Sequence, residues 1–330
     1  MRTFALVYNL SCRSGPHSKR IGLLQQAFQA QGVQLRTFLT SASGCASAVI
    51  RTAGQSGCEA ALAAGGDGTF NDLLQAAIVT GSKLPLGVVP IGSGNVLAQE
   101  LGIPVAAARV ANALAAATSK EIAVGRLSSS LPDGNTVSRY FTVAAGIGAD
   151  ARVICGVNPA WKARIGIGAY YVEAARQLLF TFETLPSFRV DFTDANCSAC
   201  RSEVVSQLIA ERVGYFGQCL AAQNGRPSLL AERFRLLLFK TKHRLPYLRY
   251  GAQMLANRFG WQRQRDIGGI EVAYARSVRC LPEPDKEVAP GVLAEVDGEM
   301  VGGLPAELTI VPNAFRLLVP IGRYQPPTTI

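Results

Sequence analysis

The residues of this chain best suited to chemistry form a glycine-rich turn, Gly65-Gly66-Asp67-Gly68-Thr69, which follows an apolar run. Glycine allows positive φ angles and lets a bulky anion approach the backbone closely. The N–H groups of such a turn, and of a helix that starts after it near Asn71, can point at phosphate oxygens. We therefore predict a phosphate-binding turn; a tight strand-to-helix turn without a ligand is the alternative.

A second turn has the same construction. Pro90-Ile91-Gly92-Ser93-Gly94-Asn95 follows the short apolar run 86–89 and precedes a helical segment that begins at Val96. Two neighbouring strands that each end in a phosphate-sized turn are hard to explain as two accidents. The chain has no G-x-x-x-x-G-K-[ST] and no G-x-G-x-x-G in its first βαβ unit, so the P-loop and Rossmann patterns do not apply.

A third group of polar residues lies near the other end of the chain, at Glu295-Val296-Asp297-Gly298-Glu299. Carboxylates around one glycine on a tight turn between strands fit a general base with a partner, because neighbouring like charges raise one pKa. A solvated hairpin turn is the alternative, since Asp-Gly is a frequent hairpin signal. Spacing alone favours the hairpin.

The first third of the chain alternates strand-like and helix-like segments. We predict strands at 3–8, 33–39, 59–64 and 86–89, and helices at 19–31, 46–53 and 70–80. This order indicates a mostly parallel sheet with helices on both faces. Ligands of such sheets bind at the carboxyl ends of the strands, where both glycine turns stand.

After about residue 123 the pattern changes to short strand-like runs, which predicts a β-rich antiparallel domain. The expected strands are 124–130, 137–145, 188–192, 204–210, 234–240, 269–274, 277–281, 294–296 and 308–312. Two helices, at 162–182 and 246–259, are expected to interrupt them. The chain thus predicts two domains of different class.

The amino-acid composition limits the kinds of partner that this chain is expected to bind. The net charge of +10 and the pI of about 9.4 indicate a nucleotide, a nucleic acid or an anionic membrane surface. No apolar run reaches the roughly 18–20 residues that span a bilayer, and the stretch after Arg2 is too brief for a signal peptide. The eight scattered cysteines are therefore expected to be reduced thiols of a cytoplasmic protein. The Cys197-x-x-Cys200 pair lacks the further ligands that structural zinc needs.

A basic segment lies between Glu232 and Asp266, which enclose nine Lys or Arg residues and no acidic residue. Its cations are Arg233, Arg235, Lys240, Lys242, Arg244, Arg249, Arg258, Arg263 and Arg265, interleaved with Phe239, Tyr247, Tyr250, Met254, Phe259 and Trp261. Such a mixture suits an anionic bilayer surface. A solvated basic helix with an ordinary core face fits equally well, and a nucleic-acid groove is less favoured.

Taken in order along the chain, the motifs resemble the diacylglycerol kinase catalytic family, which includes bacterial lipid kinases and the sphingosine and ceramide kinases. The matching residues are Gly65-Gly66-Asp67-Gly68-Thr69 with Asn71, Pro90-Ile91-Gly92-Ser93-Gly94-Asn95, Gly146-Ile147-Gly148-Ala149-Asp150-Ala151 and Asp297-Gly298-Glu299. The first motif is shared with NAD kinases and phosphofructokinases, so the ordered set makes the resemblance specific.

The resemblance implies an NAD kinase/diacylglycerol kinase-like fold of two domains with nucleotide in the cleft between them. Residues 1–123, with a last segment returning from about 314 to 330, would form the α/β nucleotide-binding domain, and 124–313 the β-rich lipid-substrate domain. ATP and Mg²⁺ are the implied cofactors. Asp297 would be the general base with Glu299 beside it, although the family's pattern also allows Glu299 in that role. The implied nucleotide-binding residues are Asn9, Thr40, Gly65, Gly66, Asp67, Gly68, Thr69, Asn71, Gly92, Ser93, Gly94 and Asn95.

The chain departs from the family at positions that matter for metal binding. Val96 and Ala123 stand where many members carry aspartate, and in some relatives those carboxylates organise a structural magnesium network with the aspartate of the first turn. Valine and alanine cannot ligate Mg²⁺. These two residues argue against an auxiliary magnesium site but leave it open, whereas the metal that accompanies ATP is expected. Beyond Asn9, the first loop also matches the family poorly.

The leading hypothesis is an ATP-dependent lipid kinase at the inner, cytoplasmic face of the membrane that phosphorylates a hydroxyl of diacylglycerol or a related lipid. Its partners would be the lipid and an anionic membrane surface, without nucleic acid, and homodimerisation is left open. A soluble-substrate kinase of the NAD kinase type is one alternative. A catalytically inactive lipid- or nucleotide-binding protein is the other, and Val96 and Ala123 motivate it.

Overall fold

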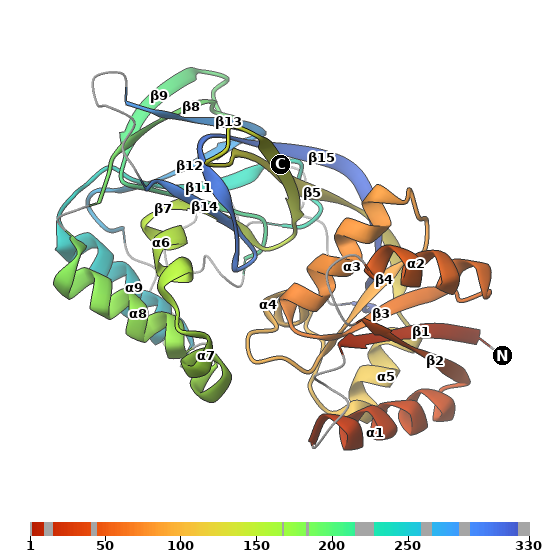
Figure 1. Cartoon of the computed structure of the whole chain (residues 1–330). Helices are drawn as coiled ribbons and strands as arrows, with labels where there is room; N and C mark the ends of the chain where they lie inside the picture. Colours follow the sequence, from red (N-terminus) through yellow and green to blue (C-terminus); the bar gives the residue numbers. More distant parts are fainter. Residues whose placement is uncertain are drawn as a thin grey trace. The chain divides into compact units, whose positions relative to one another are not determined.

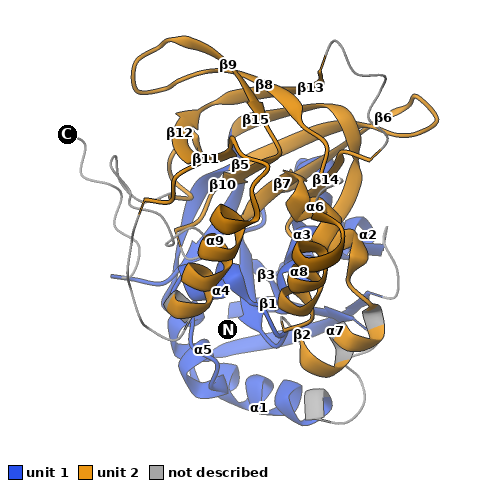
Figure 2. Ribbon diagram, turned by 90° about the vertical axis from the view of Figure 1, so that its left-hand side faces the viewer, with its two compact units in different colours: residues 1–123, 312–330 blue, residues 124–311 orange. Residues whose placement is uncertain are grey.

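A computed structural model describes residues 2–9, 16–40, 45–166, 168–182, 185–214, 228–258, 266–283 and 291–322. The chain divides into two compact units, residues 1–123 with 312–330 and residues 124–311 (Figures 1 and 2). The predicted fold class is confirmed, since the first unit is an α/β unit with parallel strands and the second is rich in antiparallel strands. Strands β5 (Thr118–Ser130) and β15 (Glu299–Val319) each run through a boundary between the units.

The first unit is built on a parallel sheet with the strand order β15-β4-β3-β1-β2. Its elements are β1 (Arg2–Asn9), α1 (Pro16–Ala30), β2 (Val33–Thr40), α2 (Cys45–Gln55), β3 (Ala60–Gly65), α3 (Asp67–Val79), β4 (Leu86–Pro90), α4 (Val96–Glu100) and α5 (Ala107–Ala115). Every residue of β3 and β4 is buried. Continuous burial is typical of parallel strands that are covered on both faces.

Helices cover both faces of this sheet. α1 packs against α5 on one face, and α2 packs against α3 on the other (Figure 1). The buried side chains of α1 are Ile21, Leu24 and Phe28, which recur at helical spacing. The Phe28 ring meets the Phe4 ring of β1 edge to face, with centroids 6.3 Å apart.

Helix α3 begins earlier than the sequence predicts, at Asp67 instead of residue 70. Gly66 is its N-cap residue in an extended conformation, with φ −94° and ψ −169°. The Phe70 N–H donates to the Gly66 carbonyl at 3.3 Å, which closes the first helical turn. Gly68 and Thr69 therefore lie inside the helix, and the first glycine turn (residues 65–69) is mostly a helix N-terminus.

The second unit is a curled antiparallel layer with the strand order β12-β11-β10-β7-β14-β15-β13-β8-β9. Its elements are β6 (Thr136–Phe141), β7 (Ala144–Gly148), α6 (Ala149–Gly156), α7 (Pro159–Ile165), α8 (Gly168–Phe180), β8 (Phe188–Thr193), β9 (Cys200–Val205), β10 (Gln207–Glu211), β11 (Phe234–Phe239), α9 (Arg244–Arg258), β12 (Ile270–Ala275), β13 (Ser277–Pro282) and β14 (Leu293–Val296). Strands at both ends of the order share one core, which includes Val190 of β8 and Leu238 of β11.

Two predicted strands of this unit are broken in the structure. The run 137–145 becomes β6 and β7, because the N–H groups of Thr142 and Val143 between them bond to a distant side chain described below. The run 204–210 becomes the end of β9 and the whole of β10, and Ser206 lies between them. Its hydroxyl donates to the Thr241 carbonyl at 2.5 Å and lies 2.8 Å from the Tyr247 hydroxyl.

The predicted lengths of one helix and one strand were also wrong. The helix expected at 162–182 is divided into α7 and α8 at Gly166, whose φ of +57° ends α7. The strand expected at 308–312 is the middle of the 21-residue β15, which starts at Glu299. The sequence does not indicate so long a strand, because it contains Gly302, Gly303 and Pro305, and glycine and proline usually end strands.

Helix α9 packs its aromatic residues on β11. The Phe239 ring lies 4.8 Å from Tyr247 and 5.2 Å from Tyr250, measured between centroids. These aromatic residues of the basic segment therefore belong to the core. Arg263 and Arg265 of that segment lie outside the described residues. Within the described residues, no helix combines the length and the apolar character that crossing a membrane requires.

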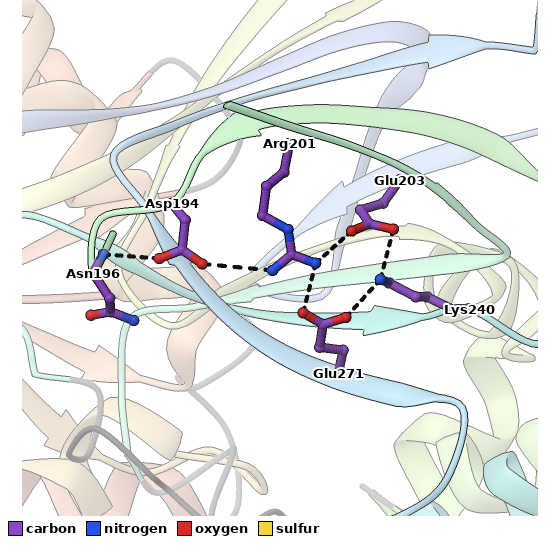
Figure 3. Close-up of polar contacts among 6 residues, drawn as sticks. All are labelled: Asp194, Asn196, Arg201, Glu203, Lys240 and Glu271. Carbon is purple, nitrogen blue, oxygen red and sulfur yellow. Dashed lines mark hydrogen bonds and ion pairs between the residues drawn. The ribbon is translucent and has the colours of Figure 1, made fainter. Parts of the chain in front are cut away.

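A network of ion pairs joins the two edges of the curled layer (Figure 3). Arg201 of β9 lies 2.7 Å from Glu271 of β12, and Lys240 lies 2.6 Å from both Glu271 and Glu203. Asp194 pairs with the other side of the Arg201 guanidinium at 3.6 Å. Among the described strands, β9 and β12 each pair with one neighbour, and charged side chains at such edges disfavour further strand pairing.

Candidate functional site

The residues of the first unit that we predict to bind a nucleotide lie at or just after the carboxyl ends of adjacent strands. Asn9 and Thr40 are register partners at the ends of β1 and β2, and Gly65 and Pro90 are partners at the ends of β3 and β4. Because these strands are parallel, the four ends lie at one edge of the sheet. The structure therefore brings both glycine turns, Asn9 and Thr40 to the same edge.

The two glycine turns pack directly on each other. The N–H groups of Ile91 and Gly92 donate to the Gly65 carbonyl at 3.1 and 3.2 Å. A Cβ atom on Gly92 would lie 2.6 Å from the Gly66 Cα and 2.9 Å from its nitrogen. A side chain at Gly92 would thus push the turns apart, so this glycine is required by packing between the turns.

Asp67 has a structural role that sequence reasoning missed. Its carboxylate accepts the Val96 N–H at 3.0 Å and the Leu97 N–H at 3.1 Å. These N–H groups belong to the first turn of α4, so Asp67 caps that helix from the other glycine turn. Asp67 therefore orders the second glycine turn (residues 92–95), and its direct contact with a nucleotide stays a prediction.

The remaining residues of the two turns differ in exposure. Asn95 has a φ of +50° and its Nδ2 donates to the Gly92 carbonyl at 2.5 Å, which closes the second turn. Asn71 is buried, and its Oδ1 accepts from Gln75 at 2.8 Å within α3. The N-cap residue of α3 is Gly66, which makes no side-chain hydrogen bond to cap the helix. Its first N–H groups are thus suited to an anion, as the positive end of the helix dipole also favours.

The predicted acidic residues of the second unit lie on a tight turn between β14 and β15, as expected. Asp297 has a φ of +50° and Gly298 a φ of +85°. Positive φ at both central residues is the signature of a type I′ hairpin turn, which favours Asp-Gly. Asp297 and Glu299 are both half-buried.

The Asp297 carboxylate is bound by backbone N–H groups. Oδ1 accepts from Val143 at 2.9 Å and from Ala144 at 3.1 Å, and Oδ2 accepts from Thr142 at 3.0 Å. These bonds fix the carboxylate over the link between β6 and β7. Glu299 instead forms an ion pair with Arg139 of β6.

Two further carboxyl groups lie beneath this turn, and sequence reasoning gave them no role. Glu295 of β14 and Asp150 of α6 share a side-chain hydrogen bond; Glu295 is buried and Asp150 is half-buried. Gly146 of β7 makes room for them, because a Cβ there would lie 2.4 Å from Asp150 Oδ2 and 2.7 Å from Glu295 Oε1. Gly146 belongs to one of the motifs that resemble the family, but its contact with Glu295 depends on the register of β7 with β14.

Burial raises the pKa values of three carboxyl groups in this unit. Burial first, and then the Asp150 charge, hold the pKa of Glu295 well above its ordinary value. Burial raises the pKa of Asp150 to about 6, against the hydrogen bond from Glu295. Burial likewise raises the pKa of Glu211 to about 7, although Arg235 lies 2.9 Å away and opposes the shift.

The residues of the first unit suit phosphate groups better than they suit an additional metal ion. The α3 N-terminus and the glycines of both turns suit phosphate oxygens. Among the residues that the structure describes, no three His, Cys, Asp or Glu side chains gather to hold a metal ion. Both Asp67 oxygens bond to N–H groups of α4, and Val96 and Ala123 offer no ligand. An auxiliary metal site of the first unit thus does not fit these residues.

Several known proteins that are similar to this chain are named as diacylglycerol kinases or lipid kinases. Residues 3–127 match the diacylglycerol kinase catalytic domain family. The diacylglycerol kinase of Bacillus subtilis (strain 168) is 25% identical over 329 residues, which cover 97% of each chain. A probable lipid kinase YegS-like of Citrobacter koseri is 29% identical over 309 residues, covering 92% of this chain and 91% of that protein.

The fold has a close counterpart among solved structures. A crystal structure of a diacylglycerol kinase from Bacillus anthracis (strain Sterne) superposes with a TM-score of 0.70, 17% identity and coverage of 98% of both chains. The resemblance read from the motifs is thereby confirmed: residues 3–127 match the diacylglycerol kinase catalytic domain family, and relatives along most of the chain are named as diacylglycerol or lipid kinases.

Proposed function

We propose that this chain is an ATP-dependent lipid kinase that transfers the γ-phosphate to a hydroxyl of diacylglycerol or a related lipid. The observation that carries the proposal is the pair of interlocked glycine turns beside a helix N-terminus, within the segment that matches the family. Kinases work mainly by positioning and by stabilising charge, and this edge of the sheet supplies N–H donors for both purposes.

The phosphates of ATP would be held by residues 65–69 and 92–95, with Asn9, Thr40 and Asn71 around them. Gly66 supports this assignment, because a Cβ there would meet only the Gly92 Cα, at an ordinary 3.6 Å. Packing thus does not require a glycine at this position, whereas the approach of an anion would. Mg²⁺ would arrive with ATP and neutralise charge on its phosphates.

Asp297 is proposed to accept the proton of the lipid hydroxyl, with Glu299 beside it. The N–H bonds from Thr142, Val143 and Ala144 hold the carboxylate in one orientation, which is what a general base requires. The ion pair with Arg139 commits Glu299 to another partner.

Contact with an anionic membrane is proposed for the exposed faces of α7, α8 and α9, which we call the helical face. Helix α8 packs against α7 and α9, and Figure 2 shows α8 and α9 alongside each other. The exposed apolar side chains of this face are Trp161, Ile165, Val172, Leu179, Phe180, Leu245, Leu248 and Leu255. Exposed basic residues lie among them, namely Arg164, Arg176, Arg244 and Arg249. Apolar side chains with interspersed cations suit the headgroup region of an anionic bilayer.

Incubation of the protein with labelled ATP, Mg²⁺ and a panel of lipids tests the kinase proposal. We expect label in diacylglycerol or a related lipid alcohol. A water-soluble acceptor that takes label in preference to every lipid would favour an NAD kinase-like activity instead. Tight ATP binding without transfer to any acceptor would point to a catalytically inactive binding protein.

Co-sedimentation with vesicles tests the membrane proposal. Vesicles that contain phosphatidylglycerol should bind the protein more tightly than vesicles of phosphatidylcholine alone, and salt should weaken the binding. Replacing Phe180 and Leu248 together by Gln should weaken it about tenfold or more, since each buried apolar side chain contributes about 1.5–3 kcal/mol. Val79→Gln is the matched control, because Val79 is 76% exposed on α3 of the other unit. Equal losses in both variants would contradict the assignment.

A further inference from the structure

We propose that Asp150 and Glu295 share one proton and act as positioning residues for the turn that carries Asp297 and Glu299. The proposal rests on the proposed function, because it assigns these residues to the same phosphoryl transfer. It concerns carboxyl groups that do not belong to the Asp297-Gly298-Glu299 motif.

The first support is the geometry around Gly146. This glycine is the register partner of Glu295 across β7 and β14. Asp150 follows β7 in the first turn of α6. A Cβ atom at Gly146 would collide with one oxygen of each carboxyl group, at 2.4 and 2.7 Å. Both groups therefore converge on the space left by the missing side chain.

The second support is the bond from this pair to the turn. Glu295 Oε2 accepts the Gly298 N–H at 2.8 Å. Gly298 stands between Asp297 and Glu299 and has a φ of +85°. Glu295 is thus linked on one side to Asp150 and on the other to the turn. A change in its charge or orientation would be felt by the turn directly.

The third support is the charge of the surroundings. Asp150 on α6 and Asp297 on the turn both act on Glu295, and Glu211 of β10, paired with Arg235 of β11, lies near Asp150. The Tyr170 hydroxyl of α8 lies close to Gly298. The only cation among these groups pairs with Glu211. Two carboxylates in contact repel each other, so the pair holds one proton. Glu295 carries it and donates to Asp150, in agreement with the raised pKa of Glu295.

The proton makes the turn sensitive to pH. A carboxyl group whose pKa is higher in the folded protein binds its proton there while the unfolded chain has already lost it. Stability therefore falls as pH rises from about 4.5 through the raised pKa of Glu295, and the loss is complete above it. Above that pH, Glu295 would repel Asp150 and Asp297. Activity should then decline on the alkaline side.

Glu295→Gln and Glu295→Leu form the test pair for positioning. Glutamine can still accept from Gly298 through its carbonyl and donate to Asp150 through its amide, and it cannot ionise. We expect Glu295→Gln to retain about a third or more of kcat at pH 7 and to lose the alkaline decline. Glu295→Leu should lower kcat about tenfold or more with little change in the KM for ATP. Equal kcat and an unchanged pH profile in both variants would overturn the positioning role.

A second measurement reads the proton without any activity. Infrared spectra of protein with ¹³C-labelled glutamate side chains at pH 7 should contain the band of a protonated carboxyl group. Glu295→Gln should remove part of that band. Glu211→Gln is the comparison variant, because Glu211, whose pKa burial raises to about 7, contributes another part of the band at pH 7. A spectrum that Glu295→Gln leaves unchanged would overturn the shared proton. If the wild-type protein phosphorylates nothing, the proposed function fails while this band still decides the proton.

Discussion

The two candidate sites both place an aspartate on backbone N–H groups, yet the surroundings of the two aspartates differ. Asp67 in the first unit caps α4 and stands among glycines and N–H groups. Asp297 in the second unit binds three N–H groups of the β6–β7 link and stands beside Glu295, whose neighbour is Asp150. The first arrangement favours an anionic ligand, and the second favours exchange of a proton.

The surroundings of these two aspartates show two ways in which a site can be built around the same type of residue. In the first unit the polar groups are backbone atoms, so the sequence requirement falls on glycines such as Gly92. In the second unit the polar groups are buried side chains, which need partners or protons to be stable. Substitutions in the two units should therefore change the free energy of unfolding by different amounts and for different reasons.

The largest loss of stability is expected from Arg235→Met in the second unit. Arg235 and Glu211 are both fully buried and lie 2.9 Å apart. Removing one partner of a buried pair costs about 3–5 kcal/mol, because the remaining charge has lost its partner. Urea unfolding measures the change. Arg235→Met with Glu211→Leu should recover most of the loss, and a double variant as unstable as the single one would contradict this account.

A smaller loss is expected from Gly92→Ala in the first unit. The new methyl group would meet the Gly66 backbone at 2.6 Å, so the two glycine turns must separate. Strain of this kind typically costs about 1–3 kcal/mol. Gly66→Ala is the matched control, because its methyl group meets the Gly92 Cα at 3.6 Å. Thermal unfolding of the two variants should differ clearly, and equal midpoints would argue against interlocked turns.

The smallest loss is expected from Asp67→Ala. The variant leaves the Val96 and Leu97 N–H groups at the start of α4 without their acceptor. Loss of a helix cap costs about 1 kcal/mol. Urea unfolding and ATP affinity should both decline, since the second glycine turn is no longer held. A variant as stable as the wild type would show that Asp67 does not order this turn.

Much of the fold follows from local sequence, and the exceptions have long-range causes. The buried apolar runs of β3 and β4 are evident in the sequence, as is the Asp297-Gly298 turn. The break between β6 and β7 was not predictable, because Thr142 donates to a side chain 155 positions away. The convergence of Asp150 and Glu295 likewise depends on the register of β7 with β14. Spacing along the chain carries no trace of either contact.

The sequence indicates less of the candidate site, and the roles of its residues stay predictions. The ordered glycine and acidic motifs indicate which turns to consider, and the structure places the first unit's residues at one sheet edge. The capping role of Asp67 was missed, because it depends on the packing of one turn against the other. Glu295 was missed as a positioning residue, because its partner Asp150 lies in a different motif.

Steady-state kinetics of Gly66→Ala and Asp297→Asn, with labelled ATP and the preferred lipid, test the central claim most directly. That claim is that the first unit binds the nucleotide and the second accepts the proton. We predict that Gly66→Ala raises the KM for ATP about tenfold or more while kcat changes little. Asp297→Asn should lower kcat about a hundredfold or more with the KM for ATP nearly unchanged. An Asp297→Asn variant that retains more than about a tenth of wild-type kcat would contradict the account.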